Sequence, residues 1–145
     1  LGSCKSLTHL PKNMHSLTKL RKLDVSETSI ECLPDSVARL PLLEMLDASK
    51  CAGLSVVPDD LGRNTTGLTT VDLSKTAISK IPSGLLLRKG LEHLDVSGCK
   101  KLKEIPLQIH SLKLKTLDVS DTSVTSLEEF ALANYRRKTI RLENE

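Results

Sequence analysis

The chain has 145 residues, of which 39% are hydrophobic and 27% are charged, and its formal net charge is +3. This balance argues against a disordered chain, and no stretch reaches the ~18 consecutive apolar residues of a transmembrane helix, so we expect no membrane association. Lys and Arg are scattered among acids, and one Phe, one Tyr and no Trp offer little to stack on bases, so nucleic acid is a poor candidate partner.

A tetrapeptide related to Leu-Asp-Val-Ser recurs along the chain at a nearly fixed interval. Its copies lie, in chain order, at residues 23–26, 46–49, 71–74, 94–97 and 117–120. The leucines three residues before these copies are spaced 23, 25, 23 and 23 residues apart. Self-similarity at this period indicates a stack of supersecondary units, none of which buries its apolar face alone.

Each tetrapeptide is predicted to be a short strand of a parallel sheet. Alternation sends its Leu and Val to one face and its Asp and Ser to the other, and strands of adjacent copies would lie ~4.8 Å apart. One buried ladder is then formed by Leu23, Leu46, Val71, Leu94 and Leu117. A second is formed by Val25, Ala48, Leu73, Val96 and Val119. A third, on the return path, is formed by Ile30, Leu54, Ile78, Leu102 and Val124.

Prolines mark a second regular element. Five of the six are spaced 23, 24, 24 and 24 residues apart: Pro11, Pro34, Pro58, Pro82 and Pro106. Proline lacks an N–H donor and fixes φ, so it suits the first position of a short helical turn. We expect such turns on the side opposite the sheet, as at residues 35–40, where Pro41 ends the turn.

Aligned on these features, the unit reads L-x-x-L-D-V-S-x-[T/C]-x-I-x-x-[L/I]-P. This pattern resembles the leucine-rich repeat, and the resemblance covers essentially the whole chain. It implies an α/β leucine-rich repeat solenoid, with a parallel concave sheet and short helical or 3-10 turns on the convex side. Residues 1–145 would form one domain of about six repeats, a piece of a longer array that continues in a strand at 140–142. Residues 127–133 read as a longer helical turn and a partial cap.

Cysteine alternates with threonine at the end of the strand motif, where leucine-rich repeats usually keep an asparagine ladder. The row contains Cys4, Thr28, Cys51, Thr76, Cys99 and Thr122. We interpret it as structural, with side chains bonding the backbone of the turn. Cysteines in this row lie two strands, or ~10 Å, apart, too far for a disulfide, and Cys32 has no partner in register. Free thiols favour a reducing, cytoplasmic compartment; the sequon at residues 64–66 is the rival observation.

No catalytic motif is recognised in this sequence. His9, His15, His93 and His110 lie at different phases of the repeat, with no partner in zinc-ligand spacing. Ser recurs as a repeat residue rather than as a nucleophile, and no phosphate-binding loop is visible. We therefore predict that the segment is not an enzyme and uses neither a cofactor nor a metal. The basic cluster at 136–138 is read as a solvated cap or loop.

Two rows of exposed side chains are the candidate binding residues. The acidic row contains Asp24, Asp47, Asp72, Asp95 and Asp118. It either holds the turns or forms a stripe for a basic segment of a partner, and mutual repulsion is predicted to raise some of its pKa values. Beside it lies a variable row of Lys22, Met45, Thr70, His93, Thr116 and Thr139, in which Met45 and His93 are the strongest contact candidates.

The leading hypothesis is a protein-interaction module that binds a protein partner through the concave sheet, without catalysis. The alternative is the recognition arm of a larger enzyme or signalling protein, such as a ubiquitin ligase, a kinase or a nucleotide-binding immune receptor. A phosphatase-bound regulatory subunit is a weaker third hypothesis. No polar cap is visible at the start, so we also expect end-to-end association of this segment.

Overall fold

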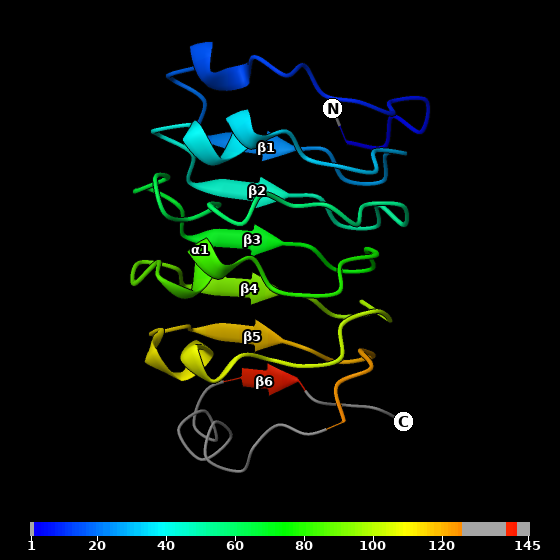
Figure 1. The fold of residues 1–145 in the computed structure, drawn as a ribbon, viewed down its shortest axis with the longest axis vertical. Coiled ribbons are helices and arrows are strands. Elements are labelled where there is room, and N and C mark those ends of the chain that lie inside the picture. The colour runs from blue at the N-terminus through cyan, green and yellow to red at the C-terminus, as the bar shows by residue number, and fades with distance from the viewer. Residues whose placement is uncertain (1, 126–138, 142–145) are drawn as a thin grey trace.

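The structure is a computed structural model that describes residues 2–125 and 139–141. Six strands form one parallel sheet in sequence order, and Figure 1 shows them stacked along the long axis of the molecule. The strands are β1 (Lys22–Asp24), β2 (Met45–Asp47), β3 (Thr70–Asp72), β4 (His93–Asp95), β5 (Thr116–Asp118) and β6 (Thr139–Arg141). From β1 to β5, each strand is followed by a path that returns to the start of the next, so the repeats predicted from the sequence are turns of one solenoid.

The strands β1 to β5 each begin one residue before the tetrapeptide and end at its aspartate, so each contains the variable residue, the apolar residue and the aspartate, whereas β6 ends at Arg141. Parallel bonding nevertheless continues past the strand ends, because the N–H of Val25 donates to the Asp47 carbonyl at 2.8 Å and that of Glu27 to the Ser49 carbonyl at 2.9 Å. The serine thus belongs to the exit from the strand and not to the strand itself.

The first two predicted ladders are buried along their whole length, and register places Leu23 beside Leu46 and Leu94 beside Leu117. In the third ladder four members are buried and Val124 is only partly so. The core is therefore aliphatic, which explains how the chain folds with almost no aromatic residues. Among the described residues, no helix is long and apolar enough to cross a membrane.

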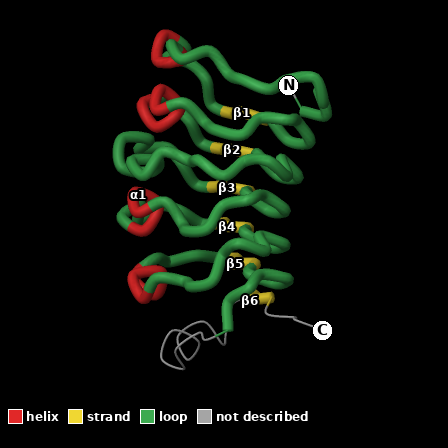
Figure 2. Tube along the Cα trace, turned by 45° about the vertical axis from the view of Figure 1, so that its right-hand side comes forward, coloured by secondary structure: helices red, strands yellow, loops and turns green. Residues whose placement is uncertain are grey.

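Short helical turns line one side of the solenoid (Figure 2). They are η1 (Met14–Ser16), η2 (Asp35–Arg39), α1 (Ser83–Leu86) and η3 (Leu107–Ser111). Pro34, Pro82 and Pro106 are the N-cap residues, one position before the predicted first helical position. Their ψ angles of 152°, 129° and 140° are extended, and each carbonyl accepts the first bond of its turn. Pro58 does the same for a turn that is not a named helix, and Pro11 precedes the N-cap Asn13.

A left-handed residue follows the serine of all five motif copies, and Ser3, which follows Gly2, has the same conformation; the six φ angles lie between 55° and 70°. The set is Ser3, Glu27, Lys50, Lys75, Gly98 and Asp121. Only one of the six is glycine, the residue for which this conformation is free of steric cost. The sequence alone therefore gave little indication of it.

The cysteine and threonine row is structural, as predicted. The hydroxyls of Thr28 and Thr76 donate to the carbonyls of Val25 and Leu73 at 2.8 and 2.7 Å. The thiols of Cys51 and Cys99 reach back to the same two carbonyls, each at 3.1 Å. All four cysteines are free, Cys4 and Cys32 exposed and the other two buried. Burial raises the pKa of the Cys99 thiol.

The helical cap predicted at 127–133 and the basic cluster at 136–138 lie outside the described residues. The strand predicted near residue 140 is present as β6, in which Ile140 pairs with Leu117.

Candidate functional site

Strand pairing arranges the candidate residues in two rows across the sheet. Each aspartate from Asp24 to Asp118 lies directly beside the aspartate of the next strand. The variable residues form the second row in the same register, from Lys22 to the backbone of Thr139. The residues between the two rows, such as Leu46 and Leu94, are apolar and buried. Because successive side chains of a strand point to opposite faces, the described side chains of both rows lie on the solvent-facing side of the sheet.

One oxygen of every aspartate in the row holds the exit turn. The Oδ1 atoms of Asp24, Asp47, Asp72, Asp95 and Asp118 accept the backbone N–H of the serine two residues later, at 2.9, 2.9, 2.9, 2.8 and 3.0 Å. Such a bond stabilises a turn in the way a backbone bond does. At Asp24 and Asp118 the serine hydroxyl also donates, at 2.6 Å. The turn-holding interpretation of the row is therefore correct, and no bond to the second oxygen, Oδ2, is present in the described part of the chain.

Repulsion along the row has less effect on its pKa values than the sequence suggests. Burial raises the pKa of the partly buried Asp72, and the charges of Asp95 and Asp47 add to this effect. The prediction that some pKa values in the row are raised is thus confirmed at Asp72, whereas bonds from the hydroxyl and N–H of Ser26 lower the pKa of the exposed Asp24 carboxyl. Hydrogen bonding outweighs the charge of one neighbour at the end of the row.

The variable row is varied in chemistry as well as in sequence. Met45 and His93 are both partly exposed. The His93 Nδ1 lies 2.8 Å from the Thr116 hydroxyl, and its Nε2 lies 4.0 Å from a carboxylate oxygen of Glu92. His93 also lines a shallow depression of about 370 Å³ shared by the strands β3, β4 and β5, whose floor includes Asp72. Its lining residues come from three neighbouring strands, so a partner that contacts the depression also meets both rows.

Ion pairs just before the strands are the feature that the sequence reasoning missed. Arg21 pairs with Glu44, and Lys115 pairs with Glu92 at 2.8 Å. All four residues occupy one repeat position, so opposite charges one repeat apart were the signal that could have revealed these pairs. Basic residues thus lie beside β1 and β5, and between them the ion pair to Glu27 and the charges of Asp47 and Asp72 raise the pKa of Lys50.

The histidines of the described residues lie apart from one another or on the convex side. Within residues 2–125 and 139–141, no group of His, Cys, Asp and Glu side chains is placed to hold a metal ion. His93 and His110 lie in separate repeats, whereas His9 and His15 line one depression on the convex side.

The sequence matches the Leucine Rich Repeat family model over residues 90–112. The chain is also similar to TMV resistance protein N of Nicotiana glutinosa, with 42% identity over 50 residues. That match covers 34% of this chain and 4% of the resistance protein. The chain thus corresponds to a small part of that relative.

Solved structures share the fold at low identity. A leucine-rich repeat protein of Leptospira interrogans matches with a TM-score of 0.82 and 23% identity, over 94% of this chain and 35% of the other. The functional domain of InlJ from Listeria monocytogenes, which includes a cysteine ladder, matches with a TM-score of 0.64 and 20% identity, over 87% and 30%. The leucine-rich repeat domain of the type III effector XopL matches with a TM-score of 0.58 and 18% identity, over 94% and 65%.

The repeats, the sheet and these similarities together define the class of protein. The chain is built from leucine-rich repeats and folds as an α/β leucine-rich repeat solenoid. Its fold is that of a protein-interaction module in general.

Proposed function

We propose that this chain binds a protein partner through its concave sheet and performs no catalysis of its own. The observation that carries the proposal is the aspartate row, in which five carboxylates in register each use one oxygen for the turn. The second oxygens accept no hydrogen bond within the described residues and lie beside a row of varied side chains. Specificity would come from that variable row, above all from Met45 and His93.

The partner we propose presents a basic segment to the row. Lys and Arg bond carboxylates more strongly than neutral donors do. At Asp72, where burial and two neighbouring aspartates disfavour the charged form, a partner cation would offset both effects. The basic residues Arg21 and Lys115 at the two ends of the acidic stretch would limit the segment to the region of β2, β3 and β4.

Site-specific crosslinking tests the surface. A photoreactive amino acid at Met45 should crosslink to a protein in a lysate of the source cells. The same group at Leu87, which is 61% exposed on the other side of the solenoid, should not crosslink to that protein. Replacing Asp47, Asp72 and Asp95 with Lys should abolish the crosslink from Met45. A crosslink that survives this reversal, or that forms equally from Leu87, contradicts the proposal.

A second function is favoured by the similarity to TMV resistance protein N. In that case the segment would be the recognition arm of a larger signalling protein such as a nucleotide-binding immune receptor, and a kinase or a ubiquitin ligase would be the other possibilities. The flanking sequence decides between these hosts. A P-loop, kinase motifs or a Cys/His cluster of the RING type would identify the receptor, the kinase or the ligase, respectively. A flanking sequence without any of these motifs would favour a stand-alone module.

The proposal includes a cytoplasmic location, no cofactor and no binding of nucleic acid or membrane. Four free thiols in 145 residues support a reducing compartment. Expression of the full-length protein as a fluorescent fusion, followed by fractionation, tests the location. A glycan on Asn64, detected as a mass shift that an amidase removes, would show passage through the secretory pathway and contradict it.

End-to-end association of this segment is part of the same proposal. Leu17 is 47% exposed, whereas Leu40 at the equivalent repeat position is buried. A second copy stacked on the first repeat would cover this leucine. Light scattering across a concentration series should show growth in mass that the variant Leu17→Glu lacks, and a constant monomer mass would contradict the expectation.

A further inference from the structure

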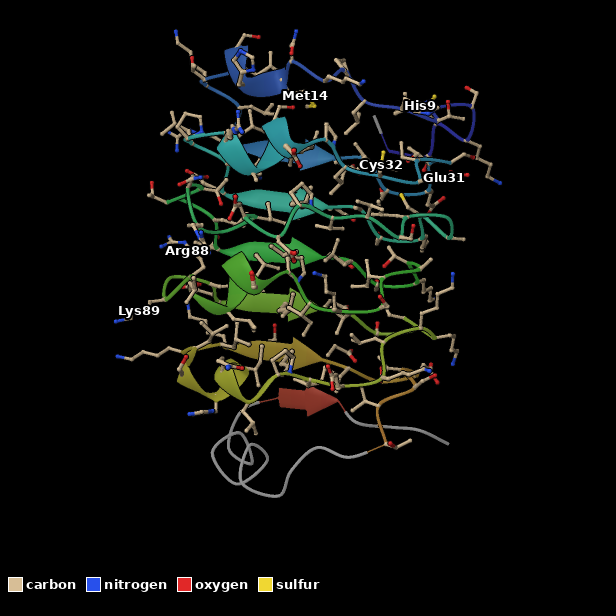
Figure 3. The ribbon with its side chains drawn as sticks, viewed as in Figure 1. His9, Met14, Glu31, Cys32, Arg88 and Lys89 are labelled. Carbon is tan, nitrogen blue, oxygen red and sulfur yellow. The ribbon has the colours of Figure 1, made fainter. Side chains whose placement is uncertain are left out.

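A depression of about 500 Å³ lies on the convex side of the first repeats, between η1, η2 and the segment just before Pro58. Figure 3 shows two of its residues, His9 and Cys32, on neighbouring coils near the start of the chain. The residues that matter for the argument are His9, Lys12, Cys32, Ser36, Arg39 and Val56. None of them belongs to the concave surface, so this depression is separate from the one proposed above.

Part of the lining of the depression is apolar, and one of its apolar side chains is exposed. Leu10 and Leu33 are buried beneath it, while Val56 is 58% exposed at its edge. The backbone below is regular, because the N–H of Leu33 donates to the Val56 carbonyl at 2.9 Å in a parallel bridge. An exposed valine on a rigid backbone is a preformed contact for an apolar side chain.

The rim of the depression is basic. Lys12 and Arg39 make no ion pair in the described part of the chain, and His9 and His15 lie beside them. Asp35 is the one acid among the lining residues, and no cation within the described residues pairs with it. The rim therefore attracts an anion rather than a cation.

The equivalent slot one repeat further along is smaller, about 230 Å³, and two of its lining residues form an ion pair. There Lys80, two residues before its proline, pairs at 2.7 Å with Asp59, one residue after the preceding proline. The equivalent pairs in the first repeats are Asp35 with Val56 and Lys12 with Cys32, and neither can form an ion pair. The charged residues that line the first slot are therefore not neutralised by such a pair.

A buried hydroxyl lines the depression without a partner. Ser36 is 6% exposed, and among the described residues its Oγ is the one buried side-chain oxygen or nitrogen that lacks a hydrogen bond. An unpaired buried hydroxyl costs free energy, but this oxygen has almost no exposed surface, so a ligand in the depression does not reach it. The unpaired cations favour an acidic group in the ligand, and the exposed valine favours an apolar one.

We propose that this depression binds an acidic peptide segment of a partner protein, with a carboxylate on Arg39 and Lys12 and an apolar side chain on Val56. A peptide suits the site better than a small molecule, because the depression is open and crosses three successive coils, about 10 Å at the spacing of parallel strands. The concave and convex faces would then select oppositely charged segments.

Alkylation of the chain's own thiols gives a direct measurement. Cys32 lies in the depression and Cys4 is exposed outside it, so the two iodoacetamide rates report the site and an internal control in one sample. The probe is acetyl-Glu-Leu-Glu-Leu-Glu-amide. At a peptide concentration about ten times its Kd, the rate at Cys32 should fall about tenfold while the rate at Cys4 stays constant.

Two variants assign the effect to the proposed contacts. Arg39→Glu should weaken peptide binding about tenfold, as for loss of a charged hydrogen bond. Val56→Thr should weaken it less and leave unfolding unchanged, whereas Ser36→Ala should leave binding unchanged and make the protein slightly more resistant to urea. Lys103→Glu and Leu107→Asn, exposed substitutions of the same kinds elsewhere on the solenoid, should leave binding unchanged.

Several results would overturn the proposal. The first is that the peptide with Gln in place of Glu protects Cys32 as well as the Glu peptide does. The second is that Arg39→Glu binds the Glu peptide with unchanged affinity. The third is that the Glu peptide gives no protection up to millimolar concentration. Protection by acetate or inorganic phosphate alone would show a small-anion site instead. Protection by phosphatidylserine vesicles but not by the peptide would show a membrane contact, which also contradicts the proposal.

Discussion

At the scale of single residues, the aspartate of the repeated motif has two oxygens in different circumstances. Oδ1 accepts the serine N–H in every described copy, so this atom is needed for the turn whatever else the residue does. Oδ2 carries its share of the negative charge and accepts no hydrogen bond within the described residues. Asparagine keeps the amide oxygen that accepts the N–H and removes the charge, so it separates the two roles.

Opposite pH dependence is expected for two members of the row. The pKa of Asp24 is lowered from 3.8, so its charge stabilises the fold above that pH and the contribution is lost as pH falls through the folded pKa. The pKa of Asp72 is raised from 3.8, so its charge opposes folding and stability is lost as pH rises through the folded pKa. At pH 7, Asp24→Asn should therefore destabilise the protein and Asp72→Asn should stabilise it.

Urea unfolding from about pH 3 to pH 7 checks this pair, each variant serving as the control for the other. Both differences from wild type should shrink at the acid end, where the carboxyls are protonated in the folded and unfolded states alike. The same sign for both variants at pH 7 would contradict the account of the row. Asp72→Ala, which also removes the acceptor, should cost about 1 kcal/mol relative to Asp72→Asn.

At the scale of elements, each repeat is closed by features that only partly show in the sequence. The prolines are visible by their spacing, but their place as N-cap residues depends on ψ, which residue type does not fix. The left-handed position is occupied by Glu, Lys, Ser and Asp as well as Gly, so only the recurring backbone geometry reveals it.

One glycine in a convex turn is predicted to be irreplaceable. A Cβ on Gly84 in α1 would lie against the Leu61 carbonyl oxygen and 2.8 Å from the Asp59 carbonyl oxygen, while the Gly84 N–H already donates to Asp59 at 2.7 Å. The turns of two repeats could not then approach as they do. Gly84→Ala should lower the free energy of unfolding by about 1–3 kcal/mol, as overpacking does.

Gly53→Ala is the matched control for this substitution. Its Cβ would meet nothing closer than a flexible Glu31 carbon at 3.4 Å, and its φ is not in the left-handed region. Chemical denaturation of the two variants should show a loss only for Gly84→Ala. Equal stability of both would mean that the turns of α1 and the preceding repeat are not packed as described.

At the scale of the whole molecule, stability comes from ladders that run through all repeats. Leu94 is buried between Val71 and Leu117 in the sheet register, so its removal leaves a cavity shared by two interfaces. Leu94→Ala should cost about 2–5 kcal/mol. Leu87→Ala, at an exposed position, should cost less than about 0.5 kcal/mol. Equal urea midpoints for the two variants would contradict the ladder.

Most of the architecture could be predicted because a repeat multiplies its own signal. Leu23, Leu46 and Leu94 are recognisable as one ladder since each copy supports the others. The candidate site was less predictable, because the division of labour between Oδ1 and Oδ2 of Asp72 does not depend on residue type. The unpaired charges beside Val56 could not be predicted, since they result from an ion pair that Lys80 forms in one repeat and Val56 cannot form in another.

The central claim is that the aspartate row holds the turns with one oxygen and binds a basic partner with the charge. The most direct test is the triple variant Asp47→Asn, Asp72→Asn, Asp95→Asn, compared with an Asp60→Asn, Glu104→Gln, Asp121→Asn control of equal net charge. Affinity for the protein captured at Met45 and the urea midpoint are measured for both. We expect the first variant to keep its stability and lose at least about tenfold in affinity, while the control keeps both. Unchanged affinity in the first variant, or an equal loss in the control, would contradict the claim.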